Sequence, residues 1–162
     1  MVANVELINY TPNPEKTVAA AARLCYSSTG ANELIEDMTD DDIKRLLQII
    51  LENGHHSTLE HISFTFAIEE ISRVTSHQLV RHRIASYSQQ SQRYVREKEQ
   101  FDYIIPEKIK SNSEIEELFK ENMTQQQKIY DKLTTKLMEE GYNEKKAIEA
   151  ARYVLPNATE TK

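Results

Sequence analysis

The chain has 162 residues, of which 39% are apolar and 28% charged, and its formal net charge is −6. This size and composition predict a single globular domain over residues 1–162, and the acidic balance argues against general nucleic-acid binding, which needs a broad positive surface. No apolar run approaches the roughly 20 residues that cross a bilayer, no signal peptide is recognisable, and a single cysteine excludes an internal disulfide and a thiolate-rich metal site. A soluble, cytoplasmic protein is expected.

Two strands and two helices are expected in the first half of the chain. In chain order they are a strand at 4–10, a helix from Pro14 that ends between Ser27 and Gly30, a helix from Thr39 to Gly54, and a strand at 61–70. Asn13 can cap the first helix, and the hydroxyl of Thr39 can cap the second. The second strand alternates and is expected to be buried on the face that carries Ile62, Phe64, Phe66 and Ile68.

The second half is expected to be mainly helical. Its predicted elements are a short helix at 72–82, strands at 93–95 and 101–106, a long helix from Ser113 to Gly141, and a last helix from Asn143 to Leu155. Ser113 and Glu116 resemble a capping box. The apolar stripe of the long helix comprises Ile115, Leu118, Phe119, Ile129, Leu133 and Leu137. Early strands and late helices predict an α+β fold, a mainly antiparallel sheet flanked by helices with a long helical C-terminal part.

One segment departs from the acidic character of the chain. From Ile71 to Arg96 there is no Asp or Glu, although the average composition would place about four there, and the segment holds five of the eight arginines. No glycine-rich phosphate loop of either common type is present. The segment therefore predicts a local cationic pocket for a small anionic ligand, bound by side chains rather than by a glycine-rich backbone.

Within the expected short helix, Gln78, Arg81 and His82 would share one face, while Arg83 would lie about 200° around the axis from Arg81. The end of this helix could then hold two anions, or two parts of one, because guanidinium binds phosphate bidentately. The polar run that follows adds neutral donors: Ser86, Ser88, Gln89, Gln90, Ser91 and Gln92. The alternative is a solvated basic helix end followed by a polar loop, but a solvated surface normally mixes both signs of charge.

All five histidines lie between residues 55 and 82, yet their spacing fits no zinc motif and no metal site is predicted. His55 could orient a ligand or relay a proton at the mouth of the pocket; a structural role is the alternative, above all for His61. Cys25 is interpreted as a small core residue rather than a nucleophile, because no base is apparent near it. Arg152, at the rim of an apolar helix face, either extends to water or enters the anionic pocket.

These residues carry a resemblance to a known family. Arg81-His82-Arg83, followed by seven residues and Ser91, is similar to the signature of flavin-dependent thymidylate synthases, and Ser86 and Arg93 fit the longer pattern RHRxxSxxxxSxR. The resemblance extends upstream through GHHSTLEHISFTF and HQLV and downstream through RY and ARYVLP. It implies an α+β enzyme that converts dUMP to dTMP, with methylenetetrahydrofolate as carbon donor, FAD as hydride carrier and NADPH as reductant, in a homotetramer with shared active sites.

The resemblance also implies roles for individual residues. The residues expected to bind dUMP are Gln78, Leu79, Val80, Arg81, Gln89, Gln90, Ser91, Gln92, Arg93 and Arg152. Those expected at the FAD site are Cys25, Ser57, Glu60, Arg81, His82, Arg83 and Gln89. His55, near the flavin and folate, is expected to take part in catalysis together with Arg81 and Ser91, which are expected to contact the phosphate of dUMP. The expected place of Cys25 at the FAD site revises its interpretation as a plain core residue.

The sequence departs from the family pattern at two places. Gln89 stands where some relatives have Glu, which preserves a hydrogen-bonding group. After RYVLP, relatives normally continue with further flavin contacts and an arginine at the uracil ring, so this chain is expected to be C-terminally truncated and to lack turnover by itself. Two other functions stay open: a non-catalytic module that binds dUMP or FAD, and an RNA-binding protein, which the acidic balance disfavours.

Overall fold

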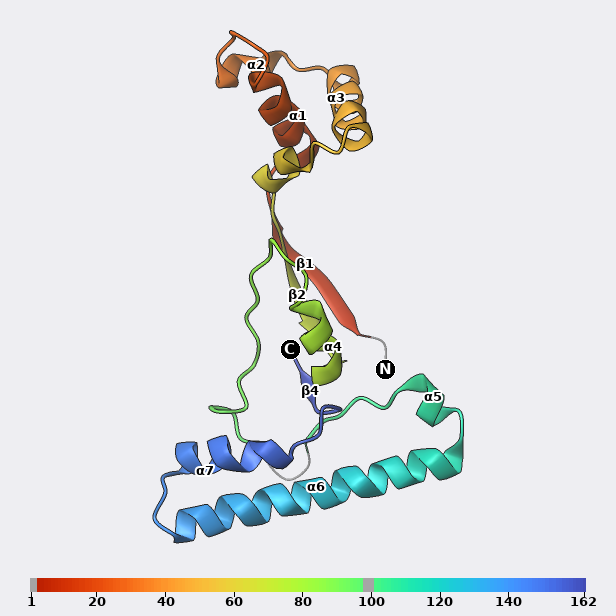
Figure 1. The fold of residues 1–162 in the computed structure, drawn as a ribbon, viewed down its shortest axis with the longest axis vertical. Coiled ribbons are helices and arrows are strands. Elements are labelled where there is room, and N and C mark those ends of the chain that lie inside the picture. Colours follow the sequence, from red (N-terminus) through yellow and green to blue (C-terminus); the bar gives the residue numbers. More distant parts are fainter. Residues whose placement is uncertain (1–2, 98–100) are drawn as a thin grey trace. The chain divides into compact units, whose positions relative to one another are not determined.

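The structure, a computed structural model, describes residues 3–97 and 101–162, and its contacts divide the chain into two compact units, largely Val5–Ala67 and Ile68–Lys162 (Figure 1). The predicted α+β class is confirmed. Helices dominate, and the strands form two small sheets, β1–β2 and the antiparallel pair β3–β4. That the chain is a single domain stays a prediction. Among the described residues no helix combines the length and apolar character needed to cross a bilayer.

The elements of the first unit agree largely with the sequence pattern. They are β1 (Asn4–Tyr10), α1 (Pro14–Leu24), α2 (Ala31–Asp37), α3 (Asp40–Glu52), the 3-10 helix η1 (His56–His61) and β2 (Phe64–Glu69). Thr39 caps α3 as predicted, through a reciprocal capping box with Asp42. Gly54 ends α3 with a positive φ of 68°, and the amide of His55 donates to the carbonyl of Ile50 at 2.9 Å. This Schellman-type turn directs the chain from α3 into η1.

Three expectations for this unit were wrong in detail, and one helix was missed. α2 was not predicted, and α1 ends at Leu24 rather than beyond Ser27. Asn13 precedes α1 but has a φ of 46° and no capping side-chain bond, so Pro14 and the backbone define that helix start. The β2 strand is not buried, since Phe64 is 48% exposed. The core lies instead between helices, where Ala19, Ala20, Met38 and Ile43 are packed together.

The second unit contains the longest helix of the chain. Its elements are β3 (Ile71–Ser72), α4 (Arg73–Leu79), α5 (Glu107–Lys110), α6 (Ser113–Glu139), α7 (Glu144–Ala151), the 3-10 helix η2 (Arg152–Val154) and β4 (Glu160–Thr161). Gly141, with a φ of 92°, ends α6 and lets the chain turn so that α7 packs beside its C-terminal half (Figure 1). Tyr130, Phe101 and Ala147 are almost fully buried in this unit.

Three local predictions for this unit are corrected. Residues 93–95 form a turn, not a strand, because the amides of Tyr94 and Val95 both donate to the carbonyl of Ser91. In the expected strand at 101–106 only Tyr103 pairs, in a single bridge with Thr159. The N-cap of α6 is one residue earlier than predicted, and its side chain accepts from two amides. That residue is Asn112, so the predicted Ser113–Glu116 capping box does not form.

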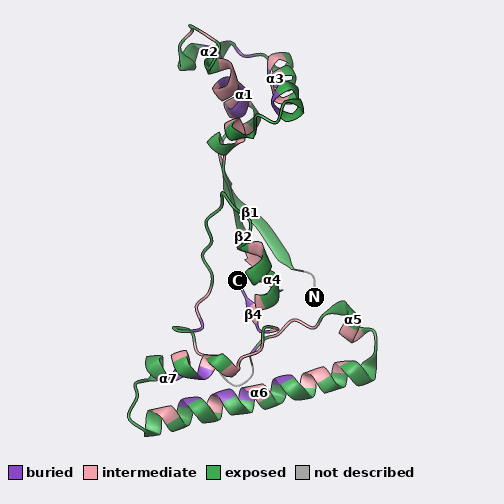
Figure 2. Ribbon diagram, viewed as in Figure 1, coloured by how far each residue is buried: buried purple, intermediate pink, exposed green. Residues whose placement is uncertain are grey.

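The buried face of α6 is not its most apolar one. The fully buried positions are Met123, Gln127, Tyr130 and Thr134. Four members of the predicted apolar stripe remain exposed, namely Ile115 (48%), Leu118 (67%), Ile129 (44%) and Leu133 (38%). Figure 2 shows the resulting pattern, in which one side of α6 is buried and the rest lies open.

Candidate functional site

The end of α4 carries the predicted arginine signature. Ser72 caps this helix by accepting from the amide of Thr75, and the helix ends at Leu79. The expectation of a helix to residue 82 was therefore wrong in extent, although Arg81 and His82 follow in hydrogen-bonded turns. Arg81 and Arg83 lie beyond the helix end, so they do not leave one helix about 200° apart as predicted.

The signature arginines lie at the surface. Arg81, His82 and Arg83 are all exposed, and neither arginine forms an ion pair within the described part of the chain. Ile84, directly after them, has a φ of 59° and is 80% exposed. A β-branched residue rarely adopts this left-handed conformation, and such strain is common where backbone is shaped for a ligand. The signature is thus presented to solvent by a strained backbone.

The residues after the signature tie α4 to β4. The side-chain amide of Gln89 donates to Ser76 Oγ at 2.7 Å and to Thr161 Oγ1 at 3.1 Å. The backbone of Gln90 donates to the carbonyl of Lys162 at 2.8 Å. The NH₂ group of Gln89 is therefore occupied within the protein, which leaves only its carbonyl oxygen to meet a ligand.

A small depression lies between Gln92 and the two residues that follow α7. It is lined by Gln92, Arg152 and Tyr153. Gln92 is only 7% exposed, yet its Nε2 has no hydrogen-bond partner among the described residues. An unpartnered buried donor costs roughly 1–3 kcal/mol, and such groups in native proteins usually meet a ligand or water. The donor set suits an anion or a planar ring with carbonyl acceptors.

Arg152 lines this depression, and two further arginines contact residues close to it in the chain. Arg93 Nε lies 2.7 Å from Glu149 Oε1, and Arg152 Nε donates to the backbone carbonyl of the same glutamate at 3.3 Å. Arg73 Nη1 donates to the carbonyl of Gln90. Burial first, and then the nearby charge of Arg152, lower the pKa of Arg73, although a guanidinium remains charged at working pH. The carboxylate-free segment thus brings positive charge close to Arg152, while a cationic pocket that binds an anion stays a prediction.

The remaining candidates belong to the first unit. His55 precedes η1, while Ser57 and Glu60 lie within it, and all three are exposed. Cys25 is also exposed, which corrects its interpretation as a core residue; its Sγ lies 3.7 Å from the carbonyl of Ala21. No group of three or more potential metal ligands gathers within the described ranges.

Sequence reasoning missed three contributors to the site. Arg73 stood in the carboxylate-free segment but was not named as a site residue, although its position on α4 places it beside Gln90. Glu149 gave no signal, because its role depends on a contact with Arg93. Tyr153 lines the depression and packs against its neighbour Arg152, whose guanidinium carbon lies 5.6 Å from the ring centroid.

Known proteins resemble the chain over most of its length. Residues 6–162 match the family described as thymidylate synthase complementing protein. The chain is 52% identical to the flavin-dependent thymidylate synthase of Clostridium tetani (strain Massachusetts / E88), over 100% of this chain and 68% of the relative. A protein of the same name from Geobacter sulfurreducens is 46% identical, over 98% of this chain and 65% of the relative. The chain thus spans about two thirds of the length of these curated relatives.

The fold also matches solved structures. The UMP/dUMP methylase PolB from Streptomyces cacaoi, bound with 5-Br dUMP, superposes with a TM-score of 0.69 at 22% identity, over 99% of this chain and 70% of that one. The same protein bound with 5-Br UMP gives a TM-score of 0.63 at 21% identity, over 99% and 69%. At this level of identity the likeness is one of fold.

Proposed function

Because this chain belongs to the family of thymidylate synthase complementing proteins, as its resemblance predicted, we propose that it forms the nucleotide-binding part of an enzyme that methylates dUMP to dTMP with a bound flavin. The names of the relatives and of the methylase with the same fold support this assignment. The proposal includes FAD as the flavin, methylenetetrahydrofolate as carbon donor and NADPH as reductant. It also includes a cytoplasmic location and a homotetramer with shared active sites.

The observation that carries the proposal is the buried, unpartnered amide of Gln92 beside Arg152. A nucleoside monophosphate offers acceptors of two kinds, phosphate oxygens and the carbonyls of uracil. In the proposed complex Arg93 and Arg152 bind the phosphate and Gln92 donates to a substrate oxygen. A guanidinium keeps its charge at any working pH, so the arginines stay able to bind the phosphate whatever the pH.

The positive charge of the arginine signature suits the phosphates of a flavin dinucleotide. Arg81 and Arg83 are exposed and lack an acidic partner within the described residues, so both can bind phosphate oxygens of a dinucleotide. When bound, the flavin supplies the hydride of the reaction. The chain's own residues bind and orient: Arg81 is shared between the two phosphorylated ligands and Ser91 donates to the nucleotide, while His55, Ser57 and Glu60 contact the cofactor, and Gln89 uses its free carbonyl oxygen.

Calorimetric titration of the 162-residue chain with dUMP tests the proposal, with deoxyuridine as the ligand that lacks the phosphate. We expect saturable binding of dUMP, much weaker binding of deoxyuridine, and loss of dUMP binding in Arg152→Ala. Arg45→Ala, which removes an exposed arginine of α3, is the matched control and should bind normally. Equal binding of dUMP by wild type and Arg152→Ala would refute the site. A separate assay for dTMP with FAD, NADPH and methylenetetrahydrofolate distinguishes an enzyme from a module that only binds.

A further inference from the structure

Charged side chains join α7 to the turn that follows the arginine signature, residues 91–96. Arg93 Nε lies 2.7 Å from Glu149 Oε1, as described above. A second ion pair lies nearer the start of α7, where Arg96 Nη1 is 3.2 Å from Glu144 Oε1. Both glutamates belong to α7 and both arginines to the turn, so charge connects these two elements at two points.

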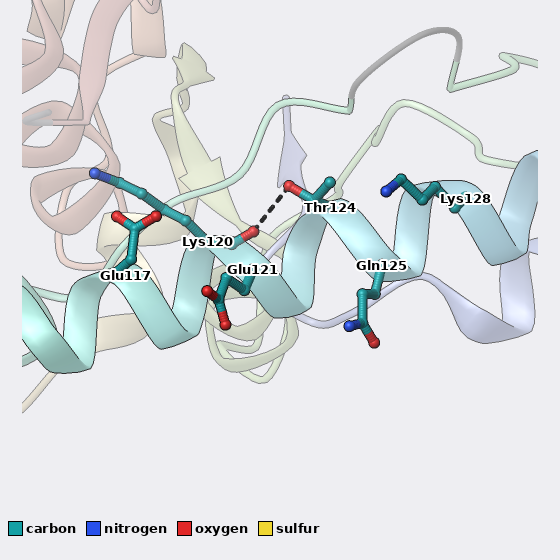
Figure 3. Close-up of a pocket in the computed structure, with 6 residues that line it drawn as sticks. All are labelled: Glu117, Lys120, Glu121, Thr124, Gln125 and Lys128. Atoms are coloured by element: carbon teal, nitrogen blue, oxygen red, sulfur yellow. Dashed lines mark hydrogen bonds between the residues drawn. The ribbon is translucent and has the colours of Figure 1, made fainter.

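The other ion pairs of this unit do not connect separate elements. Among its described residues, the three remaining pairs join side chains three or four positions apart within α5 or α6. Figure 3 shows one such helix flank, where the residues that line a shallow depression all come from α6: Glu117, Lys120, Glu121, Thr124, Gln125 and Lys128. The contacts between the turn and α7 therefore differ in kind from the other charged contacts of the unit.

The turn is bonded internally, so that it is oriented as one unit. The amides of Tyr94 and Val95 both donate to the carbonyl of Ser91, at 3.1 and 3.0 Å. The amide of Arg93 donates to Ser91 Oγ at 3.2 Å, which leaves the serine O–H free to donate to the nucleotide. Arg96 follows directly, and a contact that fixes it also orients the residues before it.

Apolar packing contributes little to holding this turn. Tyr94 is 62% exposed and Val95 is 42% exposed. Backbone hydrogen bonds hold the chain on either side of the turn, at the amide of Gln90 and at the carbonyl of Glu97. Lys145 of α7 adds a third charged contact, since its Nζ lies 4.5 Å from the centroid of the Tyr94 ring. Charge therefore does more than apolar burial to hold the turn against α7.

Arg96 depends strongly on its contact with α7. Its side chain is only 26% exposed, and Glu144 is its one acidic partner among the described residues. The Nε of Arg96 is buried and has no hydrogen-bond partner there. A partly buried guanidinium that loses its counterion is unfavourable, because its charge then faces protein rather than water. Without Glu144, the turn would lose the contact that favours its present position.

We propose that Glu144 is a positioning residue of the nucleotide site, which acts through Arg96 to hold the turn of residues 91–96 against α7. The inference rests on the proposed function, because this turn carries Ser91, Gln92 and Arg93. The side chain of Glu144 bonds to Arg96 and, within the described residues, to none of those assigned to dUMP. Once this contact is lost, the ligand must order the turn itself, and binding weakens.

Charge reversal at position 144 tests this role, because two effects of the change have opposite signs. Glu144→Arg adds positive charge to α7, and long-range attraction alone would then strengthen the binding of anionic dUMP. Loss of position predicts the reverse, with dUMP bound about three- to tenfold more weakly. The amides of Tyr94 and Val95 should also exchange with solvent about fivefold faster or more. Calorimetric titration and native-state hydrogen exchange of the 162-residue chain measure the two effects.

Two further variants separate the ion pair from other effects of the substitution. Glu144→Arg combined with Arg96→Glu restores an ion pair of reversed polarity, and it should recover most of the affinity and the slow exchange. Glu114→Arg is the matched control, because it makes the same reversal in the first turn of α6 and also loses a favourable charge at a helix N-terminus. It should bind dUMP like wild type. Circular dichroism verifies that each variant retains its helices.

The possible failures can be told apart. If Glu144→Arg binds dUMP as tightly as wild type or more tightly, the positioning role is overturned and the proposed function stands. A doubly reversed variant that recovers neither affinity nor slow exchange also overturns the role, because the ion pair would then not be the cause. A wild-type chain that binds no dUMP overturns the proposed function and the positioning role together.

Discussion

Arg93 and Glu149 form an ion pair of 2.7 Å that joins the polar run after the arginine signature to α7. Nε of the arginine is the atom engaged, so its two terminal nitrogens stay available to a ligand. The backbone of the same glutamate holds Arg152 Nε at 3.3 Å. One acidic residue thus contacts both arginines proposed to bind the phosphate of dUMP.

Glu149 is expected to position these arginines. Arg93 is 47% exposed, so the ion pair adds at most about 1 kcal/mol to the free energy of unfolding. Glu149→Ala should therefore leave the melting temperature nearly unchanged while weakening dUMP binding by roughly three- to tenfold, because Arg93 must then be ordered by the ligand. Glu149→Gln keeps an acceptor and should recover most of the affinity. Calorimetric titration measures both, and tighter binding by the alanine variant would show that the carboxylate competes with the phosphate instead.

We expect the side chain of Gln92 to lower the free energy of unfolding and to strengthen the binding of dUMP. Its buried Nε2 lacks a partner within the described structure, so Gln92→Met should raise the free energy of unfolding by about 1 kcal/mol. The same variant should bind dUMP about tenfold more weakly, because a donor to the ligand is lost. Chemical denaturation and titration of one preparation give both values.

The control for this pair of opposite effects is Gln127→Met. Gln127 is equally buried, but it accepts from the amide of Phe101 at 2.8 Å and donates to Asp131 at 2.9 Å. Its replacement should lower the free energy of unfolding by about 1–3 kcal/mol and leave dUMP affinity unchanged. A destabilised Gln92→Met variant would show that its amide is satisfied in solution by something other than the nucleotide.

Local signals were readable from the sequence, and contacts between distant residues were not. The cap by the Thr39 hydroxyl and the end of α3 at Gly54 depend on neighbouring residues, and both predictions were confirmed. The face that α6 buries was predicted wrongly, because the choice depends on distant parts of the chain. The amide of Phe101 donates to Gln127 and α7 packs against α6, while Ile129 stays exposed. The carboxylate-free segment indicated a cationic pocket, but only folding could bring Glu149 to it.

The assignment of Asn112, and not Ser113, as the N-cap of α6 can be tested by mutation. Asn112 Oδ1 accepts from the amides of Glu114 and Ile115 at 3.0 and 3.2 Å. Asn112→Ala should therefore lower the free energy of unfolding by about 1 kcal/mol, whereas Ser113→Ala, at the position that the sequence suggested, should change it little. Equal losses in both variants would mean that the serine hydroxyl shares the capping role.

Glu97 is expected to make stability depend on pH. Burial, and then the nearby Asp102 carboxylate, raise the pKa of Glu97 above its ordinary 4.5, while Arg73 partly offsets this. A carboxyl whose pKa is higher in the folded state favours folding fully below pH 4.5, and this contribution is lost as the pH rises through the folded pKa. Glu97→Gln cannot ionise, so its free energy of unfolding should rise relative to wild type as the pH increases across this window. Denaturation curves of both proteins at a series of pH values measure the difference, and curves that stay parallel would show that Glu97 ionises equally easily in both states.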